Sequence, residues 1–148
     1  PGYKYNMPDL LAALGLAQLE RWQEMNARRQ TLARLYLAGL QGLNGLDLPQ
    51  VPRYDHIHAW HLFIIKIKDY SRDAFMQKLA EYNIGYGLHF PPAHTLSYIK
   101  KTYTGNNESL PETNRAGDRI ISLPLFPDMM DEDVHYVCAA IKEILKNG

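Results

Sequence analysis

The stretch HAWHLFIIKIK, residues 58–68, decides the fold of this chain of 148 residues. It is rich in aromatic and β-branched residues, and near its end Ile65 and Ile67 alternate with Lys66 and Lys68. A two-residue period is typical of a strand with one buried face and one solvated face. We therefore predict a β-strand here, in a small sheet that has helices packed on one face.

Toward the C-terminus the pattern predicts helices and strands in turn. Ser71 is a good N-cap for a helix from Arg72 to about Tyr82, with Asn83 and Gly85 at its exit. The further elements expected are a short strand YGLHF (86–90), a short helix in HTLSYIKKTY (94–103), a loop GNNES (105–109), a helix over 111–120, an extended SLPLF (122–126) and an amphipathic helix over 131–146.

Toward the N-terminus the sequence indicates two helices in succession. The first begins near Pro8 with Asn6 as its N-cap, and apolar residues surround most of its axis, so it must be covered on nearly every side. A second, amphipathic stretch runs to about Leu43, and residues 46–55 indicate an extended connector. The predicted fold class is α+β, with about three strands in a partly antiparallel sheet and a long N-terminal helical segment.

Composition limits the classes of function. Sixteen basic residues balance sixteen acidic ones, so no field of the whole molecule attracts nucleic acid or anionic lipid. The apolar run 10–17 is far shorter than the ~20 residues that cross a bilayer. The single cysteine, Cys138, excludes an internal disulfide and suits a reducing compartment. We expect a cytoplasmic protein with neither nucleic-acid nor membrane partners.

Two segments carry residues suited to a binding site. In GYGLHF (85–90), Tyr86 and His89 stand at a strand end before two prolines, an arrangement that suits a rigid site but equally a strand ending in a proline turn. In GYKYN (2–6), just before a helix start, Lys4 can supply a charge and Asn6 a donor to an anion.

The remaining candidates have simpler interpretations. His56, His58 and His61 could begin a metal site, but no further ligands accompany them, so hydrogen bonding where a strand starts is the better interpretation and no metal is expected. Cys138 lies on the apolar stripe of the last helix, which indicates an inert core thiol.

Five blocks, taken together and in order, resemble the C-terminal part of the DegT family of pyridoxal-phosphate sugar aminotransferases. They are GYKYNMPDLLAALGLAQLERW (2–22), ARRQTLARLY (27–36), HAWHLFIIKI (58–67), IGYGLHFPPAH (84–94) and ISLPLFPDMMDEDV (121–134). The resemblance implies the small C-terminal α+β domain of a fold-type-I aminotransferase over 45–148, preceded over 1–44 by helices that connect to a large domain. In the family that large domain carries the cofactor-linked lysine, so the chain is expected to be a fragment that is inactive alone and holds no catalytic residue itself.

The same resemblance implies a function. It is transfer of an amino group from glutamate to a nucleotide-linked 4-keto-sugar, UDP-4-keto-pentose-like, with pyridoxal 5′-phosphate (PLP) as cofactor, in cell-envelope, lipopolysaccharide and lipid A biosynthesis. Family members are homodimers in which the segment matching GYKYN reaches the neighbour's cofactor phosphate, which implies Asn6 and Lys4 as cofactor contacts. The commoner family pattern has Asn at position 4 and Arg at position 6, so which of the two contacts the phosphate stays open.

The substrate side of the site is implied by another block. His89 matches the family residue that lines the sugar site, with Tyr86 as its companion, whereas His58, Trp60 and His61 are interpreted as sheet and interface residues. Two alternatives remain: a non-catalytic module that binds sugar nucleotides or a protein partner, and an unrelated metal-binding α+β domain.

Overall fold

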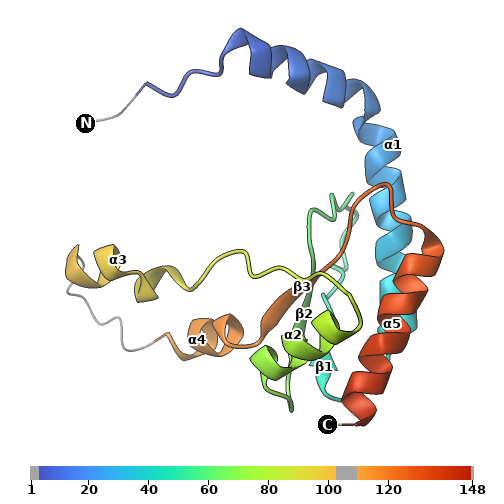
Figure 1. Cartoon of the computed structure of the whole chain (residues 1–148). Helices are drawn as coiled ribbons and strands as arrows, with labels where there is room; N and C mark the ends of the chain where they lie inside the picture. Colours follow the sequence, from blue (N-terminus) through green and yellow to red (C-terminus); the bar gives the residue numbers. More distant parts are fainter. Residues whose placement is uncertain (1–3, 103–109, 148) are drawn as a thin grey trace.

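The computed structural model describes residues 4–102 and 110–147 (Figure 1). Residues 2–3 of GYKYN and the predicted loop GNNES therefore lie outside the described residues. The elements, in chain order, are α1 (Asp9–Leu40), β1 (Leu46–Asp47), β2 (Phe63–Ile67), α2 (Arg72–Glu81), the short 3-10 helix η1 (Ala93–Thr95), α3 (Ser97–Thr102), α4 (Pro111–Gly117), β3 (Ile120–Leu123) and α5 (Asp131–Lys146).

The three strands form one antiparallel sheet in the order β1-β2-β3. Phe63 pairs with Leu123, and Ile65 pairs with Ile121, so the side chains of these four residues share one face of the sheet. Phe63 and Ile65 are fully buried, whereas Ile64 between them is exposed. The strand predicted from HAWHLFIIKIK and the α+β fold class are both confirmed.

One observed strand was not predicted, and one predicted strand is wrong. The connector over 46–55 supplies β1, because Leu46 pairs with Ile67. YGLHF forms no strand: only Gly87 bridges to Ser122. In this register Pro91 and Pro92 would lie opposite Asp118 and Gly117, outside β3, and because proline has no N–H to donate to a sheet they prevent pairing beyond Phe90. The helix predicted over 111–120 is also too long, since it ends at Gly117 and Ile120 already belongs to β3.

The two predicted N-terminal helices are one continuous helix of 32 residues, α1. The polar stretch 20–30 contains neither proline nor glycine, so nothing in it breaks a helix. Asn6 is not the N-cap, because the helix begins at Asp9 and Pro8 occupies the cap position without a side-chain hydrogen bond. The polarity of that stretch therefore marks where the helix leaves the core, not where it ends.

The core lies between the sheet and the helices α1, α2 and α5. The second half of α1 buries Leu32 and Tyr36 completely beside α5, which lies along it in Figure 1. The Tyr36 ring packs on Phe63 with 4.8 Å between centroids, and its hydroxyl donates to the carbonyl oxygen of Pro124 (2.9 Å). Arg28 joins α1 to the start of α5 through an ion pair with Asp131 (2.7 Å).

The predicted limits of α2 agree with the structure to within a residue. The Ser71 hydroxyl accepts from the Ala74 amide (3.5 Å) at the start of the helix. At its end Asn83 has a positive φ of 55°. The Ile84 amide donates back to the Leu79 carbonyl (2.9 Å), which closes the helix in a Schellman-type turn.

The first half of α1 projects away from the rest of the described chain (Figure 1). Its large apolar side chains are exposed, at Leu10, Leu11, Leu14, Leu16, Leu19 and Trp22. No described residue supplies the covering that the sequence predicts for this segment. Despite this exposed apolar surface, none of the helices within 4–102 and 110–147 has the length and hydropathy that a membrane span requires.

Candidate functional site

Two adjoining cavities lie along the side of the sheet that faces away from the core. The larger has a volume of about 500 Å³ and the smaller about 370 Å³. Leu62, Gly87, His89 and Ser122 line both of them. Ile64 pairs with Ser122 in the sheet, and both side chains point away from the buried face that carries Phe63. The cavities are therefore built on the solvated face of the sheet.

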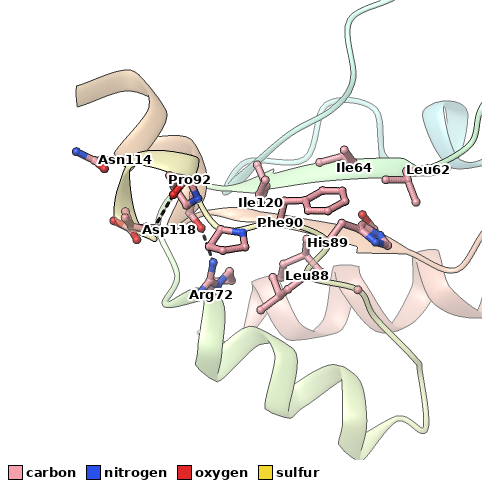
Figure 2. A pocket seen from close by; sticks show the side chains of 16 residues that line it. Leu62, Ile64, Arg72, Leu88, His89, Phe90, Pro92, Asn114, Asp118 and Ile120 are labelled. Carbon is pink, nitrogen blue, oxygen red and sulfur yellow. Dashed lines mark hydrogen bonds between the residues drawn. The ribbon is translucent and has the colours of Figure 1, made fainter. Parts of the chain in front are cut away.

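The larger cavity has an apolar wall and a polar end, which Figure 2 shows. Ile64, Phe90 and Ile120 lie together on the apolar side, and Arg72 and Asp118 lie at the polar end. The Arg72 guanidinium donates to the carbonyl oxygen of Gly117, which fixes it against the end of α4. This geometry suits a ligand with one apolar face and one polar end.

His89 stands between the two cavities, and Gly87 fixes where its ring lies. A Cβ at position 87 would sit 2.8 Å from Nε2 and 3.0 Å from Cε1 of His89, so the imidazole occupies the space that any side chain would take. Gly87 is itself held to β3 by two backbone hydrogen bonds of 3.0 Å with Ser122. The His89 imidazole therefore rests on a backbone position that the sheet holds in place.

The smaller cavity brings both predicted substrate residues together, because Tyr86 and His89 line it. It also contains His61, which the sequence interpretation assigned to the sheet and an interface. His61 lies two residues before β2, outside its pairing with β3, and it follows the left-handed backbone at Trp60, so the alternation of side chains along β2 does not place it. A left-handed turn at a tryptophan has no signal in a single sequence, so no sequence pattern predicts that His61 reaches this cavity.

Lys4 and Asn6 lie elsewhere, in the extended segment before α1. Both are exposed, and neither lines either of these cavities. The Lys4 ammonium and the Asn6 amide are suitable hydrogen-bond donors to a phosphate group. The Asp9 carboxylate, in the first turn of α1, would instead repel a phosphate that came close to it. Lys4 and Asn6 therefore have the chemistry to donate hydrogen bonds to a phosphate group, but the rest of such a site would have to come from other protein atoms.

The other candidates from the sequence have local roles. His56 Nδ1 lies 2.7 Å from the Tyr54 carbonyl oxygen, and His58 Nδ1 accepts from the Trp60 amide (2.8 Å). Within the part of the chain that the structure describes, no three His, Cys, Asp or Glu side chains gather as metal ligands would. Cys138 is buried, and burial raises the pKa of its thiol to about 11, as expected for an inert core cysteine.

The same fold occurs in solved aminotransferases. The aminotransferase TlmJ from Streptoalloteichus hindustanus matches with a TM-score of 0.86 at 27% identity, over 99% of this chain and 38% of that one. The sugar aminotransferase Spr1654 from Streptococcus pneumoniae, in its PLP form, matches with a TM-score of 0.88 at 27% identity, over 99% of this chain and 38% of that one. The fold is thus that of one part of a sugar aminotransferase.

The sequence comparisons then identify the family. The profile of the DegT/DnrJ/EryC1/StrS aminotransferase family matches residues 1–142, and this chain belongs to that family. A curated relative, the UDP-4-amino-4-deoxy-L-arabinose–oxoglutarate aminotransferase of Shewanella sediminis, is 43% identical over 155 aligned residues. The alignment covers 99% of this chain but only 40% of that relative. The resemblance inferred from the five sequence blocks is confirmed.

Proposed function

We propose that this chain is the small domain and connecting helix of a PLP-dependent aminotransferase that moves an amino group from glutamate to a UDP-linked 4-keto-pentose. The observation that carries the proposal is the 43% identity, along 99% of the chain, to an enzyme whose name states both a UDP-linked aminopentose and oxoglutarate. Oxoglutarate is the keto acid that glutamate becomes when it gives up its amino group.

The cofactor belongs to the same proposal. PLP, when bound, supplies the electron sink that amino transfer needs. Lys4 or Asn6 would contact its phosphate from the neighbouring subunit of a homodimer, since both are exposed donors in the segment before α1. The lysine that binds PLP covalently would come from the part of the relatives' length that this chain does not span, so residues 1–148 would be inactive alone. The division into residues 1–44 and 45–148 is part of this proposal too.

His89 and Tyr86 have the substrate-binding role in this proposal. They line one cavity of about 370 Å³, and an imidazole N–H and a phenol O–H both donate to sugar hydroxyl or phosphate oxygens. Gly87 leaves free the space that the imidazole occupies. These residues would bind and orient the acceptor while the chemistry takes place on the cofactor.

A panel of acceptors tests the proposed function. The protein that contains this chain, at the length of its relatives, is supplied with glutamate and with UDP-, dTDP- and GDP-linked 4-keto-sugars, and formation of the amino-sugar is measured. We expect the UDP-linked 4-keto-pentose to be aminated fastest, and His89→Ala to reduce that rate at least tenfold. His135→Ala, an exposed change on α5, is the matched control. Binding of the sugar nucleotide without amination of any acceptor would overturn the proposal.

A further inference from the structure

One guanidinium joins the segment that carries His61 to the segment that follows β3. Arg29, in the middle of α1, directs a single nitrogen, Nη1, at three backbone carbonyl oxygens: Leu125 (2.8 Å), Trp60 (3.2 Å) and His61 (3.4 Å). Trp60 and His61 lead into β2, and Leu125 follows β3. His61 and Leu125 both line the smaller cavity, so the hydrogen bonds of Arg29 hold together two segments of its wall.

The turn that presents His61 is strained. Trp60 has a positive φ of 44°, a left-handed conformation that is rare for a bulky residue and persists only where the surroundings enforce it. Its indole is buried between the rings of His58 (4.2 Å between centroids) and Phe63 (5.7 Å). Its amide donates to Nδ1 of His58 (2.8 Å). Packing and hydrogen bonds thus hold a backbone conformation that the chain would otherwise avoid.

The strained turn presents a side chain that does nothing for the fold. His61 is exposed, and its imidazole has no hydrogen-bond partner among residues 4–102 and 110–147. It lines the cavity that His89 and Tyr86 also line. The same left-handed turn that buries the Trp60 indole in the core leaves an unpaired imidazole at the wall of a cavity, where it is available to a ligand.

We propose that His61 is a ligand-contacting residue of the same site as His89, and that Arg29 and the left-handed turn at Trp60 position it. The inference rests on the proposed function for the ligand, a UDP-linked pentose. Sugar hydroxyl and phosphate oxygens accept hydrogen bonds from an imidazole N–H, so a second imidazole on the cavity wall adds one donor to the oxygen-rich part of that ligand.

The first test is a binding measurement that does not depend on turnover. Calorimetry on the protein that contains this chain, at the length of its relatives, gives the dissociation constant for UDP-xylose, an unreactive UDP-linked pentose, in wild type, His61→Ala and His135→Ala. We expect His61→Ala to weaken binding about tenfold, the effect of one lost hydrogen bond, and His135→Ala to leave it unchanged. Equal binding by all three proteins, or no binding by the wild type, would overturn the role of His61.

The positioning role has its own readout. Arg29→Gln should weaken UDP-xylose binding in the same direction, but the double variant with His61→Ala should bind no more weakly than His61→Ala alone, because Arg29 acts through His61. Additive losses would show that Arg29 acts on binding independently, which overturns its positioning role. Circular dichroism checks that the Arg29→Gln protein is folded, and Arg29→Lys, which keeps the charge, replaces it if it is not.

The test separates this inference from the proposed function. If wild type binds UDP-xylose, His61→Ala weakens that binding and yet no keto-sugar is aminated, the site stands and the aminotransferase assignment fails. If amination is normal in both wild type and His61→Ala with unchanged acceptor KM, the assignment stands and the role of His61 fails. In the supporting case the acceptor KM rises in His61→Ala while the KM for glutamate does not.

Discussion

At the scale of single residues, the position of His89 depends on the absence of a side chain two residues earlier. Gly87→Ala would place a Cβ within 2.8 Å of Nε2 of His89, so the imidazole must move out of its present place. We expect this variant to lower kcat/KM for the sugar acceptor nearly as much as His89→Ala does. His135→Ala, the exposed change on α5, is again the control, because His135 lines neither cavity. Wild-type kinetics for Gly87→Ala would contradict the argument.

The buried thiol of Cys138 should make the stability of the fold depend on pH in the alkaline range. Burial stabilises its neutral thiol and raises the pKa from 9.0 to about 11. Its contribution to stability is therefore fully present below pH 9 and is lost as the pH rises through 11. Burial also raises the pKa of the Tyr36 hydroxyl, which acts in the same direction. Urea unfolding at pH 7, 9 and 10.5 should show a falling free energy of unfolding, with a shallower fall in Cys138→Ala; equal slopes in the two proteins would contradict the role of the thiol.

The sequence predicts those residues of the candidate site that belong to a local pattern, and it misses the one that does not. Tyr86 and His89 were found because a glycine-flanked aromatic and an imidazole before two prolines form a local pattern. His61 is predicted from the sequence to be a sheet residue, because its place at the cavity depends on the irregular turn at Trp60 and on neighbours that are far apart in sequence. The predicted roles of Lys4, Asn6, His89 and Tyr86 in binding remain predictions.

At the scale of elements, the contact between α1 and α5 depends on Gly39. A Cβ there would lie 2.7 Å from Sγ of Cys138, so Gly39→Ala forces the two helices apart or displaces the thiol. We expect a loss of about 1–3 kcal/mol in the free energy of unfolding, measured by urea denaturation.

Two further variants check that the cause of this loss is steric. Gly15→Ala, in the exposed first half of α1, has nothing within 4 Å of the new Cβ and should be neutral or slightly stabilising. Adding Cys138→Ala to Gly39→Ala removes the clashing sulfur, so the double variant should lose less than the sum of the two single changes. Strict additivity would mean that the helices do not meet at this point.

Periodicity predicted β2, α2 and α5 because each carries its own signal: alternation, a Ser cap or an apolar stripe. Periodicity failed where a strand depends on pairing with a segment that is distant in the sequence. β1 is only two residues long and exists through its pairing with β2, and YGLHF lost strand pairing that its residue types favour. Polarity within 20–30 was interpreted as the end of a helix, although it reflects only the change from packed to exposed surface along α1.

At the scale of the whole molecule, the exposed apolar half of α1 should make the chain self-associate. Leu11 and Leu14 are 54% and 57% exposed, within a larger apolar surface of the kind that monomers rarely leave open. We expect light scattering on residues 1–148 to show association that increases with concentration. The double variant Leu11→Glu and Leu14→Glu should reduce it without changing the thermal stability of the domain, since glutamate is also a good helix former.

A charge added elsewhere serves as the control for that experiment. Ala139→Glu changes an exposed position on α5 and should leave the association as it is in wild type. A sharp monomer for the wild-type chain at high concentration would contradict the prediction.

The continuity of α1 has a mechanical consequence. At 1.5 Å per residue, about 30 Å of unbroken helix separates Arg29 from the segment that carries Asn6. The helix bends along this length (Figure 1), so a tilt of about 5° at Arg29 would move the far end by at most about 2.6 Å, nearly the length of a hydrogen bond. Any tilt of α1 at Arg29 would therefore change which atoms Lys4 and Asn6 can reach, with no contact at either residue.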